Sequence, residues 1–390
     1  MSAAAIAIAA FATSSPAAAA SFSNADLAAV VRRSMAQHHL RAVIVQVRID
    51  GTNAYTAAYG DSMSGVPATT HMHFRNGALA FTYMSTLLLE LVDRKKTSLN
   101  ARLSTYFPSL PNANGVTLKE LAQMTSGYAD YVYQPELGDA MNRDPFRRWS
   151  TDELIRIGDS NPMQFRPGSN WGYSHTNYAI LGRVLEKIAG MPLAGALKRY
   201  VLQPMGLQQT HVSSTPAIPE PVLHTFTSER RAALGIKPGV PFFEEATFWD
   251  PSWTTVEGAV ETTDIDDLNT SMEAVAFGKL LSKASAAAQT TPTLIGFGHT
   301  QPNCAACRAN TRSFNYGLGV IISGGWITQT LGFAGATGTV GCLPSRHLCV
   351  AIESTNGPAA YDSKGNAGFG AVDVFRAVVE KIAPNTLPAP

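Results

Sequence analysis

The sequence predicts an α+β fold, in which an antiparallel β-sheet is flanked by helices and carries an inserted, mainly helical domain. Two observations predict it: β-rich runs lie near both ends of the 390-residue chain, and helical patterns fill the middle. Strands at both ends can complete one sheet if the chain between them is an insertion. We therefore expect residues 21–104 and 311–390 to form the sheet domain and residues 105–310 to form the helical domain.

The first hundred residues predict a helix, a hairpin and a second helix. Apolar residues recur at helical spacing over residues 24–38. Two β-rich runs, 42–49 and 54–60, flank an Asp-Gly turn signal, which predicts a hairpin. Residues 78–91 are Leu-rich without Gly or Pro, so we expect a deeply buried helix there, with Ser85 inside the helix–sheet contact.

The middle of the chain contains further helical patterns separated by long loops. Helices are predicted over residues 117–124, 151–158, 177–190 and 260–281. An aromatic loop, residues 242–253, also carries Glu244, Glu245 and Asp250. We expect these carboxylates to form a solvated rim, since the alternative of paired acid–base chemistry has only their proximity to support it.

The last 75 residues return to short β-rich runs that end at Gly or Pro turns. The expected strands cover residues 315–323, 328–335, 337–343 and 347–355, and a helix over 371–382 follows.

The first twenty residues are small and apolar, and Ala18 to Ala20 precede Ser21 as in a signal-peptide cleavage site. No Lys or Arg precedes the apolar run, so we expect the natural start to lie upstream; the alternative is a disordered Ala-rich tail. We expect export to the cell envelope or medium, with no transmembrane helix in the mature chain. The net charge of +1 gives no electrostatic reason to expect nucleic acid as a partner.

Four cysteines are present, and in an exported protein they should pair. Because each pair is close in sequence, we favour Cys304–Cys307 and Cys342–Cys349. The alternative, a four-thiolate zinc site, fits neither an oxidising compartment nor the spacing of the second pair. No other metal or cofactor motif is found.

Several segments resemble the class C β-lactamases, DD-peptidases and related esterases, a family with a penicillin-binding serine hydrolase fold. The segments occur in the family's order along nearly all of the mature chain. They are residues 73–100, 117–131, 165–190, 202–210, 316–320 and 332–356.

The resemblance implies catalysis by a Ser-x-x-Lys pair, a tyrosine and a cation that holds the substrate carboxylate. Here Ala78 stands at the serine position and Phe81 at the lysine position, so the usual covalent route is chemically excluded. The tyrosine motif reads Tyr173-Ser174-His175, with His175 in place of asparagine. The Lys/His-x-Gly motif reads Phe333-Ala334-Gly335, without the cation.

The replacements all make the expected cleft less polar. We infer an apolar pocket, either plugged by Phe81 and Phe333 or open to a hydrophobic ligand. Tyr173 and His175 are interpreted as buried, hydrogen-bonded side chains rather than catalytic groups. Ser126 is expected in a structural turn, and His299 in a loop near the mouth of the cleft.

Three functions follow from the resemblance. The first is a non-catalytic relative, a pseudoenzyme that binds a small molecule, peptide or acyl ligand, or a protein partner, in the cleft. The second is a divergent hydrolase in which Tyr173 and His175 activate water and the backbone N–H groups of Ala78 and Ala334 polarise a carbonyl. The third is a scaffold with a filled cleft.

Overall fold

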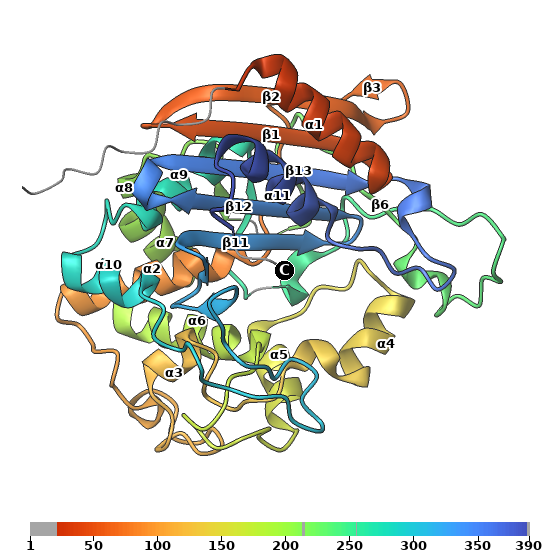
Figure 1. The fold of residues 1–390 in the computed structure, drawn as a ribbon. Coiled ribbons are helices and arrows are strands. Elements are labelled where there is room, and N and C mark those ends of the chain that lie inside the picture. The colour runs from red at the N-terminus through yellow and green to blue at the C-terminus, as the bar shows by residue number, and fades with distance from the viewer. Residues whose placement is uncertain (1–21, 213–214, 255, 388–390) are drawn as a thin grey trace, which may run out of the picture.

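The computed structural model describes residues 22–212, 215–254 and 256–387 of the chain. Its main feature is an eight-stranded antiparallel sheet, shown in Figure 1. In spatial order the strands are β3 (Val66–Pro67), β2 (Thr52–Met63), β1 (Leu40–Ile49), β13 (Leu348–Asn356), β12 (Ala336–Leu343), β11 (Trp326–Phe333), β10 (Ile321–Ser323) and β9 (Asn315–Tyr316).

The sheet joins the two ends of the chain at its centre. Strand β1 pairs with β13, with Val45 opposite Ile352, and β13 pairs with β12, with Ala351 opposite Val340. The predicted α+β fold with a sheet built from both ends is therefore confirmed.

Each face of the sheet is covered by helices because side chains alternate between the faces along every strand. On one face, Val43 and Val45 pack with helices α1 (Asn24–Gln37) and α11 (Gly370–Ile382), which lie in front of the sheet in Figure 1. On the other face, Ala42 and Ile44 belong to the larger core.

Helix α9 (Ile265–Ala276) packs on this second face, against β1, β12 and β13. It falls inside residues 105–310, the predicted helical insertion, so part of that range contributes to the sheet layer. The exact division of the chain into domains stays a prediction.

Helix α2 (Leu79–Asp93) runs through the core beneath the sheet. Every residue from Leu79 to Leu91 is buried, as expected for a helix that is apolar on all sides. Ser85 is fully buried and its hydroxyl lies 2.7 Å from the Tyr178 hydroxyl, so its predicted burial is confirmed.

Most of the remaining helices form a layer below the sheet in Figure 1, whereas α8 lies beside the sheet and contacts α9. Helix α6 contacts α2, α3 and α5, and thus lies at the centre of this layer. The helices are α3 (Leu118–Ala122), α4 (Pro135–Arg143), α5 (Thr151–Asp159), α6 (His175–Ala189), α7 (Leu193–Leu197), α8 (Gln203–Met205) and α10 (Lys283–Thr290).

Two predicted elements differ from the structure. Residues 260–281 do not form one helix: β8 (Val260–Thr263) pairs with β4 (Phe74–Arg75) and β5 (His211–Val212), and α9 begins only after Asp264. The Asp264 carboxylate accepts a hydrogen bond from the Asp267 N–H at 2.8 Å, which caps α9.

The predicted strand 315–323 is also interrupted. It divides into β9 and β10, which pair with each other around Gly319, whose φ of +71° reverses the chain. A small two-stranded sheet of β6 (Phe226–Thr227) and β7 (Glu244–Glu245) completes the strands.

Both predicted disulfides are confirmed. Cys304 bonds Cys307, and Cys342 bonds Cys349 at a paired position of β12 and β13. All four thiols are thereby used, which contradicts the alternative zinc site.

The predicted signal peptide, residues 1–20, lies outside the described residues. Among the helices that are described, none combines the length and the hydrophobicity needed to cross a membrane.

Candidate functional site

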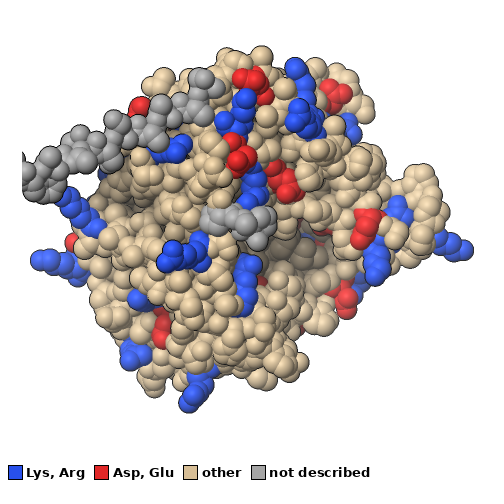
Figure 2. All heavy atoms as spheres, viewed as in Figure 1, with Lys and Arg blue, Asp and Glu red and all other residues tan. Residues whose placement is uncertain are grey.

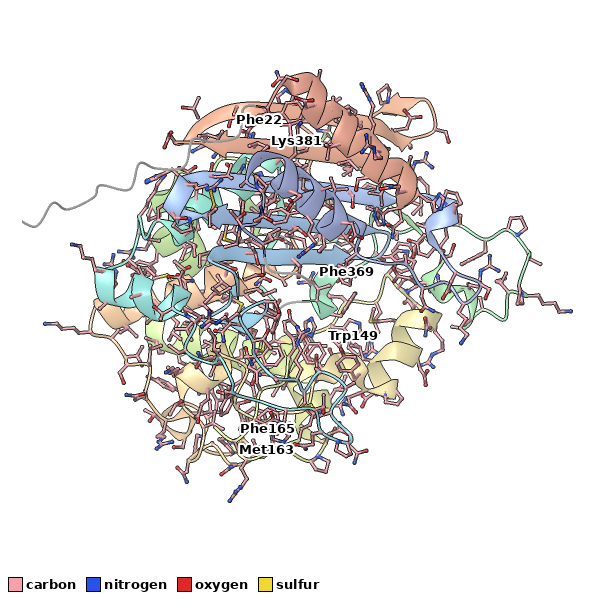
Figure 3. All side chains as sticks on the ribbon, viewed as in Figure 1. Phe22, Trp149, Met163, Phe165, Phe369 and Lys381 are labelled. Atoms are coloured by element: carbon pink, nitrogen blue, oxygen red, sulfur yellow. A yellow bond between two sulfur atoms is a disulfide. The ribbon has the colours of Figure 1, made fainter. Side chains whose placement is uncertain are left out.

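A cleft of about 740 Å³ opens between the sheet and the helical layer. It is visible as the hollow right of centre in Figure 2. Its walls come from the start of α2, the segment before α6, the β11–β12 turn, the Cys304–Cys307 loop and the loop before α11. Figure 3 places Phe369, from the last of these loops, between the sheet and the helices.

Six of the seven site residues that the sequence predicted line this cleft, and the seventh lies beneath it. The six are Ala78, Tyr173, His175, Phe333, Ala334 and Gly335. Segments more than 250 residues apart in sequence are therefore brought to one place.

The start of α2 forms one wall. Ala78 is the residue before the first helical position, and Gly77 precedes it with a φ of +47°. A Cβ on Gly77 would lie 2.6 Å from the Gly332 amide nitrogen, so glycine permits close approach of the helix start to β11. This contact places Gly332 of β11 beside Gly77, the residue preceding Ala78.

Phe81, one turn further along α2, does not line the cleft. Its side chain is 1% exposed, and its ring stacks on Tyr178 with centroids 4.1 Å apart. The rings of Tyr173 and His175 lie 6.0 and 5.6 Å from it. Phe81 is thus a core residue directly below the polar side chains of the cleft.

The segment entering α6 supplies those polar side chains. His175 Nδ1 lies 3.0 Å from the carboxylate of Asp130, which is almost fully buried and also accepts the Val132 N–H at 3.1 Å. Nδ1 therefore donates to Asp130, and Nε2 is left as the ring's remaining polar atom. Burial, reinforced by the negative charge of Asp130, raises the pKa of Tyr173 well above its ordinary value, so its phenol stays protonated at neutral pH.

The β11–β12 turn forms the facing wall. Phe333 pairs with Ala336 across a turn made by Ala334 and Gly335, and Gly335 has a φ of +78°. The Gly335 N–H donates to the Glu229 carboxylate at 3.4 Å. The ring of Phe333 stacks on Trp253 at 6.2 Å, which holds it against the wall.

The expectation of an apolar or plugged pocket needs correction. Phe81 and Phe333 do not pack on each other: one lies in the core and the other on the wall, and the cleft between remains open. Polar and charged side chains also line it, namely Tyr133, Tyr173, His175, Glu229, Arg308, Thr330, Thr337, Asn356 and Asn366.

Sequence reasoning missed three of the residues that give the cleft its charge. Asp130 was visible only as an acid in a segment that resembles a family turn. Glu229 and Arg308 lie far from any expected motif. The one available signal for Arg308 was its place directly after Cys307, in a loop that a disulfide would fix.

Other predicted candidates have structural roles. The buried Ser126 hydroxyl hydrogen-bonds Asn177, which confirms its place in a structural turn. His299 lies in the loop network beside the cleft, where its N–H donates to Asn170 at 2.9 Å. Asp250, expected in a solvated rim, is instead buried and accepts the Ser252 N–H at 2.9 Å.

The acidic residues of the neighbouring β7 are paired. Glu244 bridges Arg230 at 3.1 Å, and Glu245 lies 2.6 Å from His224. Among the described residues, no group of three or more His, Cys, Asp or Glu side chains is placed to hold a metal ion.

Comparison with known proteins places the chain in a family. The model of the beta-lactamase family matches residues 27–368. Penicillin-binding protein 4 of Amycolatopsis lactamdurans is 30% identical over 222 residues, which cover 55% of this chain and 53% of that protein. Esterase EstB of Burkholderia gladioli is 30% identical over 207 residues, covering 49% and 52%. The chain thus spans about half the length of these curated relatives.

Solved structures show the same fold. D-amino acid amidase from Ochrobactrum anthropi SV3, complexed with L-phenylalanine, aligns with a TM-score of 0.76 at 17% identity, covering 91% of this chain and 98% of the other. A D-stereospecific amidohydrolase from Streptomyces sp. aligns with a TM-score of 0.73 at 20% identity, with the same coverage.

Proposed function

The chain belongs to the beta-lactamase family and has its serine hydrolase fold, and we propose that it binds a ligand in the cleft without forming an acyl-enzyme. The ligand is a small molecule, a peptide or an acyl compound. The names of its relatives, which include a penicillin-binding protein, an esterase and an amidase, support a ligand with a carbonyl group.

One observation carries the proposal: the helix that begins at the cleft wall presents Ala78 there and buries Phe81 one turn later. A methyl group has no nucleophilic atom, and a phenyl ring neither takes nor gives a proton. Tyr173 does not replace them, because its raised pKa keeps the phenol protonated.

The open, mixed lining of the cleft favours a ligand over a filled scaffold. A cleft of this volume is in the range of small-molecule sites, and apolar walls with a few convergent polar groups are typical of such sites. The rings that were expected to plug it leave it open: Phe81 is packed in the core, and Phe333 is stacked on Trp253 at the cleft wall.

A two-part experiment tests the proposal. Intact mass spectrometry after incubation with a fluorescent penicillin should show no adduct. Thermal shift against a panel of peptides, amides and acyl esters should identify compounds that raise the melting temperature, because a ligand that binds only the native state stabilises it.

Gly332→Leu provides the test of location. Gly332 is exposed, and a Cβ there meets only Phe369 at 3.6 Å, so a leucine extends into the cleft and should abolish the thermal shift. Gly138→Leu adds the same side chain on α4, where a Cβ meets nothing within 4 Å, and should leave the shift unchanged. A stable penicillin adduct on the wild-type chain would refute the proposal, and a panel without any stabilising compound would favour a scaffold.

A divergent hydrolase is a second candidate, favoured by the Asp130–His175 hydrogen bond. It leaves His175 Nε2 able to accept a proton from water in the cleft, the task of a general base. Turnover of a chromogenic short-chain ester that is lost in both Tyr173→Phe and His175→Gln would support this function. Turnover that persists in both would exclude these residues as its source.

We also propose that the protein acts outside the cytoplasm. Two disulfides and a penicillin-binding relative are compatible with an extracytoplasmic location. Edman sequencing of the secreted protein that begins at Ser21 would support export with cleavage after residue 20.

A further inference from the structure

Arg308 is the one Lys or Arg among the described residues that line the cleft. It follows Cys307 on the wall opposite the β11–β12 turn. No carboxylate of the described residues lies within ion-pair distance of it, whereas Arg230 and Arg75 nearby have Glu244 and Glu261 as acidic neighbours. Arg308 is therefore a cation of the cleft lining that forms no ion pair with a described residue.

Aromatic rings hold the guanidinium of Arg308 in place. Its central carbon lies 3.5 Å from the centre of the Phe314 ring and 5.4 Å from that of Trp171. A guanidinium stacked on a ring uses its flat face and leaves its N–H donors, which point outward in the plane, free for a ligand. The Arg308 residue as a whole is exposed, while partial burial of its guanidinium lowers the pKa of that group.

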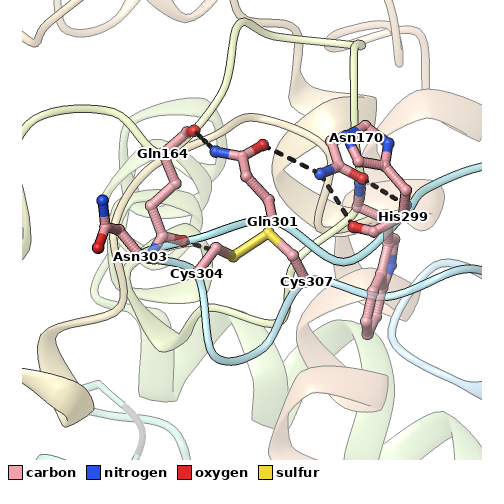
Figure 4. Close-up of a disulfide and its surroundings, with 8 residues drawn as sticks. Gln164, Asn170, His299, Gln301, Asn303, Cys304 and Cys307 are labelled. Atoms are coloured by element: carbon pink, nitrogen blue, oxygen red, sulfur yellow. Dashed lines mark hydrogen bonds between the residues drawn. A yellow bond between two sulfur atoms is a disulfide. The ribbon is translucent and has the colours of Figure 1, made fainter.

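The loop that carries Arg308 is fixed to the helical layer, as Figure 4 shows. The Asn170 side chain accepts the His299 N–H at 2.9 Å and donates to Gln301 Oε1 at 3.3 Å. Cys307, disulfide-bonded to Cys304, forms a β-bridge with Gly172, the residue before Tyr173. The backbone at Arg308 is therefore held in a defined position relative to Tyr173.

Exposed aromatic side chains lie elsewhere on the lining of the same cleft. Tyr133 and Phe369 are 59% and 55% exposed, although large aromatic side chains normally lose most of their surface on folding. Glu229 also lines the cleft, so a ligand with one negative charge suits it better than a phosphate with two.

We propose that Arg308 anchors the carboxylate of an aromatic monocarboxylate, whose ring packs against Tyr133 or Phe369. The anchor comes from the disulfide loop and replaces a cation that the β11–β12 turn does not supply. This inference rests on the proposed function, since it specifies the ligand of the same cleft.

Phenylacetate and its neutral analogue phenylacetamide test the proposal by isothermal titration calorimetry. Phenylacetate should bind at least about tenfold more tightly, because a guanidinium forms a stronger hydrogen bond with a charged carboxylate than with a neutral amide. Arg308→Gln should remove this difference, and Arg308→Lys should retain part of it. Arg312→Gln removes the same charge from an exposed site outside the cleft lining and should leave the difference intact.

Two further probes examine each half of the ligand. Acetate should bind about tenfold more weakly than phenylacetate if the ring contributes. Phosphate that bound as tightly as phenylacetate would overturn the proposal in favour of a general anion site. Equal affinity of phenylacetate and phenylacetamide, or an undiminished difference in Arg308→Gln, would also overturn it.

The failure of this inference is distinguishable from failure of the proposed function. If panel compounds stabilise the chain in a Gly332→Leu-sensitive manner but carboxylates have no advantage, only the Arg308 anchor is wrong. If neither phenylacetate nor any panel compound binds, both are wrong.

Discussion

The first turn of α2 and the entry to α6 meet in one aromatic cluster, yet they differ in chemistry. On the α2 side stand Ala78 and Phe81, which have no group that exchanges a proton. On the α6 side stand Tyr173 and His175, the latter hydrogen-bonded to buried Asp130. The Phe81 and His175 rings touch edge to face, 5.6 Å apart, so the two kinds of side chain share one environment.

The apolar Phe81 side chain on α2 is packed into the core and leaves no cavity at its position. Phe81 fills a buried site, so its loss would open the core. On the other side, His175 is hydrogen-bonded to Asp130 and lines the cleft together with Tyr173. The proposed function accordingly assigns ligand contacts to the α6 side, facing an α2 side that has no reactive group at Ala78 or Phe81.

The largest effect is expected from Phe81→Lys. It removes a stacked, 1% exposed ring and buries an ammonium among Tyr173, His175 and Tyr178 without a counter-charge. We expect a loss of about 3–5 kcal/mol in the free energy of unfolding, comparable to deletion of a core Phe, measured by urea denaturation at pH 7.

Phe81→Leu is the control, since it keeps the site apolar and should cost only about 1–2 kcal/mol. Wild-type stability in Phe81→Lys would contradict the contrast between the two segments, because it would mean that the α2 side accommodates a lysine.

Asp130→Asn tests the α6 side. It replaces the charged acceptor of His175 Nδ1 by a neutral amide, and we expect the chain to lose about 1–3 kcal/mol because a hydrogen bond to a buried charged group is weakened. The same unfolding measurement applies, and the imidazole ¹⁵N shifts should report a changed tautomer.

Asp152→Asn is matched to it as a control. Asp152 accepts from Arg183 at 3.0 Å but its side chain is 78% exposed, so this change should cost below about 0.5 kcal/mol. Equal losses in the two variants would show that the Asp130–His175 pair has no special role in ordering the cleft.

The contrast between the two segments also explains what the sequence could predict. Periodicity and turn signals predicted the sheet and the main helices, because these depend on local patterns and on burial of whole faces. The resemblance of ordered segments assigned Ala78, Tyr173, His175 and Phe333 to one site, and in the structure all four line the same cleft.

What sequence reasoning could not supply is pairing across loops. The Asp130–His175 hydrogen bond joins residues 45 apart, and its existence depends on how η2 (Tyr131–Tyr133) packs on α6. Arg308 reaches the cleft because of the Asn170 network and the β-bridge at Gly172, neither of which has a sequence pattern. The strand β8 was mistaken for helix because its partners lie about 50 and 190 residues away.

Glu353 allows a test of whether the protein interior disfavours a charged side chain at a site outside the cleft lining. It lies on β13, is 1% exposed, and its Oε2 has no hydrogen-bond partner among the described residues. Burial raises its pKa well above the ordinary value. The folded state therefore holds a proton that the unfolded chain releases above about pH 4–5, so stability falls as the pH rises above that range towards the raised pKa of Glu353.

Glu353→Gln removes this pH dependence. We expect the variant to be more stable than the wild type at pH 7 and similar to it near pH 4, with the gap growing by up to about 1.4 kcal/mol per pH unit. Urea unfolding at pH 4, 5.5 and 7 measures the gap. A stability difference between the variant and the wild type that does not change with pH would mean that Glu353 is ionised inside the protein. This result would contradict the premise that the interior disfavours unpaired charges, from which the cost of Phe81→Lys is also predicted.

The smallest effect is expected from Ala78→Ser, which introduces a nucleophilic atom on the α2 side. Ala78 has helical backbone angles, φ −67° and ψ −3°, whereas a capping serine needs an extended conformation, so the hydroxyl should add no cap and change stability by less than about 0.5 kcal/mol. Acylation should also stay absent, because Phe81 offers no base to take the serine proton. Intact mass after incubation with a fluorescent penicillin checks this. An adduct would show that a base on the α6 side, with His175 the first candidate, takes the proton of a serine at this position. The chemical difference between the two segments would then depend on residue 78 alone.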